Sequence, residues 1–346
     1  MQRSVFEKNL IERFSLSSSS STVSSLAVTS GGERLFVGTS DGYIQLFECR
    51  GNTKCALLDT IRKQSKDKKP ITTLICVESW RVIICIADGV VTAYDSQFYQ
   101  LLSTIVDNKG CHLFAVSEKT YSLVLANKKK LFLYSWQSPG FALRKEMSLG
   151  DIPKCLHCLE HSGSVIVGYK RHYELVDLTT SISTRVVDVE KEHQMFCLEL
   201  PNSITRPASI LLSLGTQGIV MEYAKLLSVE GISVESGALS VYSSTVLEWL
   251  AAPVSAYLVN PFIVSHLSDS LNTIEIHDLA TLNSLQKISV FNTPLLYDRV
   301  SLYTCFVDAE AFKQQYVYIC NGDQMATLNL VPISAQIDQV LVLFNF

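Results

Sequence analysis

Short apolar runs joined by polar turns recur along the whole chain. Residues 34–48 show the pattern, because an apolar run is followed by Asp41-Gly42 and then by an alternating run that starts at Tyr43. An Asp-Gly turn between two such runs predicts a β-hairpin. The same pattern occurs at residues 34–48, 81–95, 121–136, 164–177, 210–223, 262–278 and 316–330.

The spacing of these hairpin units predicts the fold. They recur every 40 to 54 residues, which is close to the blade period of a β-propeller. Between them there is room for two more strands per unit, for example at 101–105 and 284–290. We therefore predict an all-β, seven-bladed β-propeller that forms one closed ring over about residues 5–331, with the N-terminal segment pairing into the last blade. No Trp-Asp dipeptide or Gly-His opening accompanies the repeats, and an irregular β-sandwich is the alternative.

We expect the propeller domain to span residues 1–331 and a tail to follow it. Two segments lie outside the repeats, one within this domain and the other in the tail. Residues 15–25 are serine-rich and predict a flexible loop. Residues 332–346 predict a short C-terminal helical tail, because Ile333, Ile337 and Phe344 fall on one helical face. Such a face needs a partner, so we expect the tail to be the start of a truncated α-helical region.

Composition and hydropathy narrow the class of protein. With 346 residues, 47% of them hydrophobic and 18% charged, the chain is a globular protein rather than a disordered or fibrous one. The charges in the first ten residues argue against a secretory signal. Residues 249–268 lack charges and have the length of a membrane span. Pro253 and Asn260-Pro261 interrupt them, which favours a strand, a turn and a second strand.

The cysteines give no strong metal or disulfide signal. Ten cysteines without a signal peptide indicate reduced thiols rather than a disulfide framework. Cys155 and Cys158, with His161 nearby, have metal-like spacing, but no second ligand pair follows and His172 and His193 are isolated. Side chains alternate between the two faces of a strand, which separates such ligands. We predict that Cys155 and Cys158 are structural and bind no metal, with a metal or redox role as the alternative, and we predict no cofactor.

One catalytic motif is present but lies in the wrong context. Gly38-Thr-Ser40-Asp-Gly42 matches the Gly-x-Ser-x-Gly nucleophile elbow, which requires a strand, a sharp turn and a helix. Here an alternating strand follows the serine, and the hairpin turn already explains Asp-Gly. No phosphate-binding loop or dinucleotide fingerprint occurs. We predict no catalytic residues and a non-enzymatic binding platform, whose loops carry recognition.

Positive charge gathers in the middle of the chain. Between residues 109 and 171 ten Lys or Arg residues stand against four acids, although the whole chain carries a net charge of −4. Equivalent turns of successive blades fall on the same rim, so we predict one interaction surface formed by Lys128, Lys129, Lys130, Lys170 and Arg171. Its partner would be an acidic protein or an anionic membrane, and solvated turns are the alternative. Nucleic acid is not expected, because no aromatic residues interleave with the basic runs.

Several segments resemble the citron homology (CNH) domain, and in particular the N-terminal domain of vacuolar-sorting tether subunits. These subunits belong to the HOPS and CORVET complexes and form the Vam-type vacuolar sorting and TGF-β receptor-associated protein family. The likeness is clear from about residue 71 to residue 173, recurs in the tail and is weak over residues 180–310. It rests on residues 109–114, 127–136, 151–154, 167–171 and 331–337, together with Tyr173.

The resemblance implies a function in membrane traffic. It implies a propeller followed by an α-solenoid, binding of a Rab-type small GTPase and association with other HOPS or CORVET subunits. The expected location is cytoplasmic, peripherally associated with late endosome, lysosome or vacuole membranes. A signalling adaptor of the TGF-β receptor-associated or small-GTPase scaffold type is the alternative. An enzyme built on a propeller is a further one, but the sequence shows no cluster of acids or histidines for it.

Overall fold

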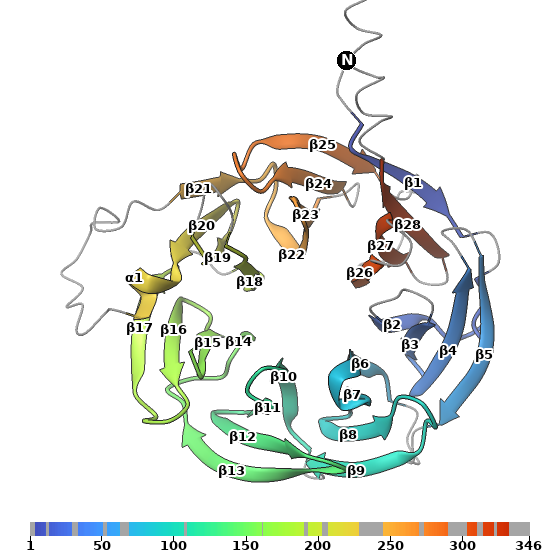
Figure 1. Ribbon diagram of the computed structural model, residues 1–346, viewed down its shortest axis with the longest axis horizontal. Coiled ribbons are helices and arrows are strands. Elements are labelled where there is room, and N and C mark those ends of the chain that lie inside the picture. The colour runs from blue at the N-terminus through green and yellow to red at the C-terminus, as the bar shows by residue number, and fades with distance from the viewer. Residues whose placement is uncertain are drawn as a thin grey trace, which may run out of the picture. The chain divides into compact units, whose positions relative to one another are not determined.

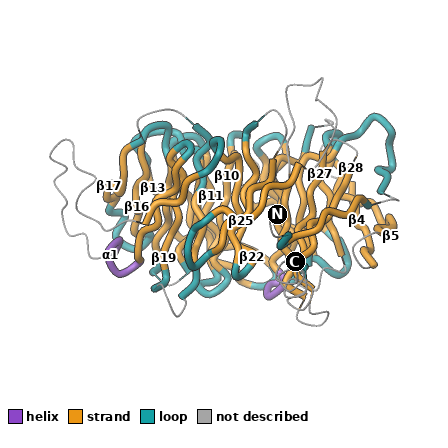
Figure 2. The backbone as a smooth tube through the Cα atoms, turned by 90° about the horizontal axis from the view of Figure 1, so that it is seen from above, coloured by secondary structure: helices purple, strands orange, loops and turns teal. Residues whose placement is uncertain are grey.

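The computed structural model of the protein describes most of the chain between residues 4 and 331. The described ranges are 4–11, 14–29, 34–50, 54–62, 69–106, 109–160, 162–189, 193–202, 207–227, 245–269, 273–289, 303–309, 314–321 and 324–331. Strands dominate these ranges (Figure 2), and helix α1 (Tyr223–Leu227) and the 3₁₀ turn η1 (Glu78–Trp80) are the helical elements within them. The expected helical tail at residues 332–346 lies outside the described residues.

The strands form seven antiparallel sheets of four strands each, the blades of a β-propeller (Figure 1). Blades 1 to 3 contain β2 (Val23–Val28), β3 (Arg34–Thr39), β4 (Tyr43–Arg50) and β5 (Lys54–Arg62); β6 (Ile71–Val77), β7 (Val82–Ala87), β8 (Val90–Asp95) and β9 (Leu101–Val106); and β10 (Cys111–Ser117), β11 (Ser122–Asn127), β12 (Lys130–Gln137) and β13 (Gly140–Ser148).

Blades 4 to 7 have the same design. They contain β14 (Cys155–Leu159), β15 (Ser164–Gly168), β16 (His172–Asp177) and β17 (Ser183–Asp188); β18 (Cys197–Leu200), β19 (Ser209–Leu214), β20 (Gln217–Glu222) and β21 (Thr245–Glu248); β22 (Pro253–Val259), β23 (Phe262–Leu267), β24 (Thr273–Asp278) and β25 (Ser284–Ser289); and β26 (Tyr303–Ala309), β27 (Gln314–Asn321) and β28 (Gln324–Leu330) with β1 (Phe6–Leu10).

The hairpin units of the sequence are the second and third strands of the blades. In blade 3, for example, β11 pairs with β12 so that Asn127 lies opposite Lys130 and Lys128-Lys129 form the turn. The two additional strands expected at 101–105 and 284–290 are β9 and β25. The all-β, seven-bladed propeller is therefore confirmed, and the β-sandwich alternative is wrong.

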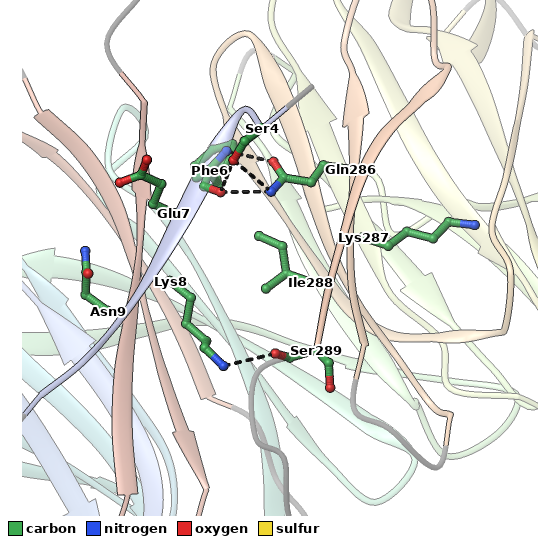
Figure 3. Close-up of a pocket in the computed structure, with 9 residues that line it drawn as sticks. All are labelled: Ser4, Phe6, Glu7, Lys8, Asn9, Gln286, Lys287, Ile288 and Ser289. Carbon is green, nitrogen blue, oxygen red and sulfur yellow. Dashed lines mark hydrogen bonds between the residues drawn. The ribbon is translucent and has the colours of Figure 1, made fainter. Parts of the chain in front are cut away.

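The N-terminal strand completes the last blade, as the sequence predicts. Strand β1 pairs antiparallel with β28, with Phe6 opposite Leu330. Strand β25 touches the same segment, because Gln286 Oε1 accepts hydrogen bonds from Val5 N (2.7 Å) and Phe6 N (2.8 Å) and Gln286 Nε2 donates to Phe6 O (2.8 Å). Lys8 Nζ also donates to Ser289 O, so two side chains join β1 to β25 (Figure 3).

The chain forms two compact units. One comprises Met1–Cys111, Ser270–Ile274 and Leu285–Phe346, and the other comprises His112–Asp269 and Glu275–Ser284. In the first unit, apolar side chains of blade 1 pack with Tyr318, Cys320 and Met325 of blade 7, while Phe36 and Ile44 of blade 1 pack with blade 2.

The second unit has its own apolar layers between successive blades. Leu131 and Met147 of blade 3 pack against Val165 and Val167 of blade 4. Further layers join blade 4 to blade 5 and blade 5 to blade 6. Burial of these runs, which the sequence marks as apolar strands, is the main force that holds the blades together.

Three blades share an aspartate turn between the third and fourth strands. In each turn the aspartate carboxylate accepts hydrogen bonds from backbone N–H groups two or three residues further on, and the residue four positions after the aspartate has a left-handed backbone. The aspartates and left-handed residues are Asp95 with Tyr99, Asp177 with Ser181, and Asp278 with Leu282. This turn sets where the fourth strand begins.

Two sequence expectations are corrected here. The serine-rich segment is not a loop to its end, because β2 begins at Val23 and Ser25 is 3% exposed, with its hydroxyl donating to Ile71 O. The cysteines are not all thiols, because Cys49 and Cys55 form a disulfide with a Cα–Cα distance of 4.3 Å. The register of β4 and β5 places these two residues directly opposite each other, which sequence spacing alone does not reveal.

The uncharged segment at residues 249–268 forms strands. It contains β22 and β23, joined by a tight turn at Asn260-Pro261, as predicted. Among the described residues, no helix is long and apolar enough to cross a membrane.

Candidate functional site

The basic turn of blade 3 is built by the β11–β12 hairpin. Lys128 takes the left-handed conformation with φ of 51°, which favours glycine or asparagine over lysine. The side chains of Lys128, Lys129 and Lys130 are exposed. Lys129 Nζ donates to Gly150 O (3.2 Å), and Lys130 Nζ lies 2.5 Å from Glu146 Oε1.

The Lys128 ammonium has no ion-pair partner in the part of the chain that the structure describes. The ion pairs of its two neighbours are exposed, and such pairs contribute only about 0–1 kcal/mol. A partner with acidic side chains can therefore exchange with them at little cost. The turn presents three cations, and among the described residues Lys129 and Lys130 have acidic partners whereas Lys128 has none.

The basic turn of blade 4 is held by contacts between the two residues that flank it. Lys170 and Arg171 lie between Tyr169 and His172. The rings of Tyr169 and His172 have centroids 4.8 Å apart, and Tyr169 N donates to His172 O (2.8 Å). Burial and the nearby Glu174 carboxylate raise the pKa of the Tyr169 hydroxyl, so that the phenol stays neutral. Lys170 and Arg171 are both exposed at the tip of this turn.

The linker from β13 to β14 contacts residues of both turns. Asp151 Oδ1 lies 3.4 Å from Lys129 Nζ, and the same carboxylate interacts electrostatically with His172 of the blade 4 turn. A hydrogen bond from the Ile152 backbone N–H, assisted by Lys129, lowers the pKa of the Asp151 carboxyl. The structure therefore brings the five predicted residues to one side of blades 3 and 4, which we call the basic rim.

Sequence reasoning did not assign a role to the linker itself. Lys154 is exposed and adds a further cation beside the two turns, and the side chain of Ile152 is 44% exposed between them. Asp151 lies among these cations and Glu146 pairs with Lys130, and the six exposed cations of the basic rim outnumber these two carboxylates. In the sequence, the signal for this linker is its charged residues Asp151 and Lys154, which lie between the two basic turns along the chain.

A hollow of about 560 Å³ opens below the blade 3 turn. It is lined by Asn127, Lys128, Lys129, Lys130, Phe132, Ser148 and Leu149. Phe132 and Leu149 are half-buried, whereas Ser148 and the three lysines are exposed. The hollow thus combines an apolar floor with a cationic edge, and all of its residues belong to blade 3 or directly follow β13.

The Cys155–Cys158 segment is part of the core. Cys155 packs in the layer between blades 4 and 5, whereas Cys158 packs in the layer between blades 3 and 4. Burial raises the pKa of the Cys158 thiol far above its usual range, which opposes thiolate formation. No group of three or more His, Cys, Asp or Glu side chains is arranged to hold a metal within the described ranges. That Cys155 and Cys158 bind no metal stays a prediction.

The serine of the Gly-x-Ser-x-Gly motif has a structural environment. Ser40 lies in the turn between strands β3 and β4, and no helix follows it. Its hydroxyl oxygen accepts a hydrogen bond from Thr22 N (3.0 Å), while Ser40 N donates to Thr22 O (2.9 Å). These contacts fasten the turn to the segment before β2.

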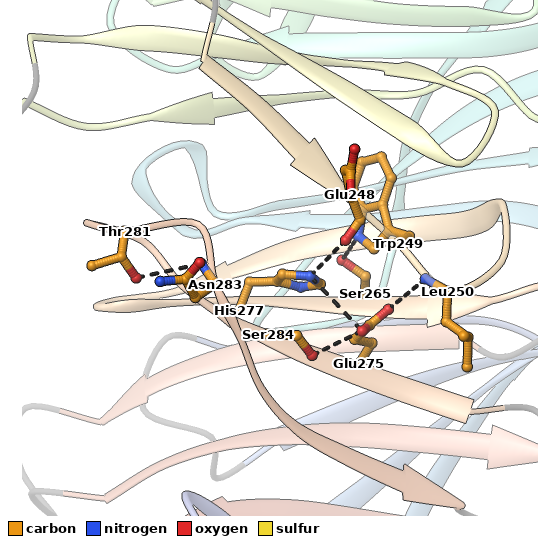
Figure 4. A network of polar contacts seen from close by, with 9 residues as sticks. All are labelled: Glu248, Trp249, Leu250, Ser265, Glu275, His277, Thr281, Asn283 and Ser284. Atoms are coloured by element: carbon orange, nitrogen blue, oxygen red, sulfur yellow. Dashed lines mark hydrogen bonds and ion pairs between the residues drawn. The ribbon is translucent and has the colours of Figure 1, made fainter.

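Blade 6 contains a buried acid that fastens its neighbouring linker (Figure 4). Glu275 is 2% exposed, and its carboxylate accepts hydrogen bonds from Leu250 N (3.0 Å) and Ser284 Oγ (2.8 Å). His277 Nε2 lies 3.9 Å from this carboxylate and 3.1 Å from Glu248 O. Each group is directed at the backbone or at strand β25, so the network supports the fold of the linker between β21 and β22.

Trp249 anchors the same linker. Its indole Nε1 donates to Ser265 Oγ (2.9 Å), and its ring packs edge-on against Phe196 and His277. Gly218 makes room for the ring, since a Cβ at that position would lie 2.6 Å from it. The tryptophan therefore joins blades 5 and 6 of the second unit.

Comparison with known proteins identifies the type of domain. The family model of the CNH domain matches residues 31–297. This range begins before β3 and extends past β25, and it contains the whole basic rim. No curated protein matches the chain.

Proposed function

Because the chain belongs to the CNH domain family, we propose that it is a non-enzymatic protein-interaction domain of a vesicle-tethering subunit. The subunit would act in transport from endosomes to lysosomes or vacuoles and in the fusion of these membranes. CNH propellers are generally interaction modules, which supports the coarser part of this proposal. The likeness of residues 71–173 to HOPS and CORVET subunits supports the finer part.

The proposed partner is a Rab-type small GTPase, bound at the basic rim. The observation that carries this proposal is the excess of exposed cations around Asp151 on two adjacent turns. Clustered cations repel one another, and an acidic protein surface relieves that repulsion while it speeds association. Other tether subunits would bind elsewhere on the protein, and anionic lipid could add a peripheral contact.

The test is a binding screen of this chain against a panel of Rab proteins, each loaded with GDP and with a non-hydrolysable GTP analogue. We expect one or a few members to bind in a nucleotide-dependent and salt-sensitive manner. The variant Lys129→Glu/Arg171→Glu should reduce that binding at least about tenfold, because each reversal places a like charge against the acidic partner. Unchanged binding by this folded variant would refute the assignment to the basic rim.

The second candidate function, a signalling adaptor, uses the same type of domain with a different partner. The family match supports it equally, because that match identifies the CNH domain without identifying its partner. A receptor tail or a small GTPase of another branch would then replace the Rab protein. Adding purified HOPS and CORVET subunits and a receptor tail to the same screen separates the two functions.

A further inference from the structure

The hollow of blade 3 differs from an ordinary solvated turn because its floor is apolar. Successive side chains along β12 point to opposite faces of the sheet. Lys130 and Phe132 therefore lie on one face, while Leu131 lies on the other face and is buried in the core with blade 4. Phe132 therefore does not contribute to the layer between blades 3 and 4. Its ring lines a space of about 560 Å³ together with the side chain of Leu149, which also packs against that layer.

The edge of the hollow carries the charge. Lys128, Lys129 and Lys130 all line it, and within the described ranges the acids paired with the last two are Asp151 and Glu146. Ser148 lies opposite Lys130 in the pairing of β12 and β13 and closes the hollow with a small, exposed side chain. An occupant therefore needs an apolar group for the floor and negative charge around it.

We propose that this hollow binds an apolar side chain of an acidic partner segment, with Lys128 and Lys129 pairing with the carboxylates that flank that side chain. The inference rests on the proposed function, because both assign partner binding to the same side of the protein. A protein segment fits better than a membrane, since a bilayer surface is broad and a single side chain can enter a concave site. Burial of the apolar side chain gives affinity, and the lysines give charge selection.

Two fluorescein-labelled peptides test the proposal directly. One is an acidic peptide of Asp and Glu residues with a single central Phe, and the other replaces that Phe by Ser. We expect the Phe peptide to bind at least about tenfold more tightly, because it alone buries an aromatic ring. Equal binding of the two peptides, or binding of neither, would overturn the proposal.

Two protein variants locate the peptide. Ser148→Trp fills the hollow from an exposed position and should abolish the preference for the Phe peptide. Gln137→Trp places the same side chain at the other, exposed end of β12 and serves as its control. Lys128→Glu should weaken binding of both peptides, whereas Lys119→Glu, on the β10–β11 turn at the opposite end of the blade, should not.

The outcomes separate this inference from the proposed function. If a Rab protein binds and Ser148→Trp changes neither that binding nor the peptide preference, the inference fails and the proposed function stands. If no Rab protein binds but the peptide preference is lost in Ser148→Trp, the inference stands alone. If charge reversal abolishes flotation with phosphatidylserine liposomes and the peptides do not bind, the rim contacts membranes and the inference is overturned.

Discussion

Truncation of Gln286 is expected to loosen the N-terminal strand specifically. The Gln286 amide makes hydrogen bonds of 2.7 Å and 2.8 Å to the backbone N–H groups of Val5 and Phe6 and one of 2.8 Å to Phe6 O (Figure 3). Val5 and Phe6 are 2% and 1% exposed, so water replaces these bonds only when the strand opens. At about 1 kcal/mol for each bond, Gln286→Ala should lower the free energy of opening β1 by about 2–3 kcal/mol.

Hydrogen exchange measured by mass spectrometry is the suitable assay. A loss of this size raises the exchange rate of the peptide that contains β1 by roughly 30- to 140-fold, since 1.4 kcal/mol corresponds to a factor of ten. Gln286→Glu keeps the acceptor for the two N–H groups and loses the donor to Phe6 O, so its effect should be intermediate.

Lys287→Ala is the matched control, because it truncates the adjacent, exposed side chain of the same strand. It should leave exchange in β1 unchanged. If β1 is as protected in Gln286→Ala as in the parent protein, then β28 alone holds the strand and the reasoning about Gln286 is wrong.

Three further predictions concern stability. Trp249→Ala should lower the free energy of unfolding by about 3–5 kcal/mol in urea titrations, because Trp249 is 5% exposed and bonds Ser265; a loss below about 1 kcal/mol would refute its anchoring role. Backbone N–H groups of Thr180 and Thr179 lower the pKa of Asp177, so this carboxylate stabilises the fold above about pH 4, and the contribution is lost as the pH falls through the lowered pKa. Because Asp177 is half-buried and remains in contact with solvent, Asp177→Asn should cost less than about 1 kcal/mol at neutral pH and flatten the acid limb of the stability profile, and an unchanged acid limb would contradict the assignment. Reduction of the Cys49–Cys55 disulfide, whose cysteines lie 6 residues apart, should lower the free energy of unfolding by about 2 kcal/mol. Urea titrations with and without reductant measure this loss, and a Cys49→Ala/Cys55→Ala variant, which should not respond to reductant, is the control.

The repeated hairpins of the fold could be predicted from the sequence, because the signals for each hairpin are local. Each hairpin needs an apolar run, a turn and an alternating run, and these signals lie within about 16 residues of each other. For the same reason the turn at Asn260-Pro261 was predictable within an otherwise uncharged segment. The pairing of β1 with β28 followed from the need to cover an open sheet edge.

Contacts that depend on strand register or on neighbouring blades could not be predicted from the sequence. The Cys49–Cys55 pairing depends on which residues face each other across β4 and β5. The contacts of Gln286 with Phe6 cross 280 residues of sequence and leave no local pattern.

At the candidate site the sequence identified the cations but not what lies between them. The position of Asp151 depends on how the linker between blades 3 and 4 folds, and the hollow beside Phe132 depends on how β12 and β13 pair within blade 3.

The most direct test of the account is the affinity of the Rab protein selected by the panel for three forms of this chain. The parent, Lys129→Glu/Arg171→Glu and the control Lys119→Glu should be compared by titration calorimetry at low and physiological salt, after circular dichroism confirms that each is folded. The account predicts that the double variant binds at least about tenfold more weakly at low salt, while the control binds like the parent. Equal affinity of all three folded forms would contradict the assignment of partner binding to the basic rim.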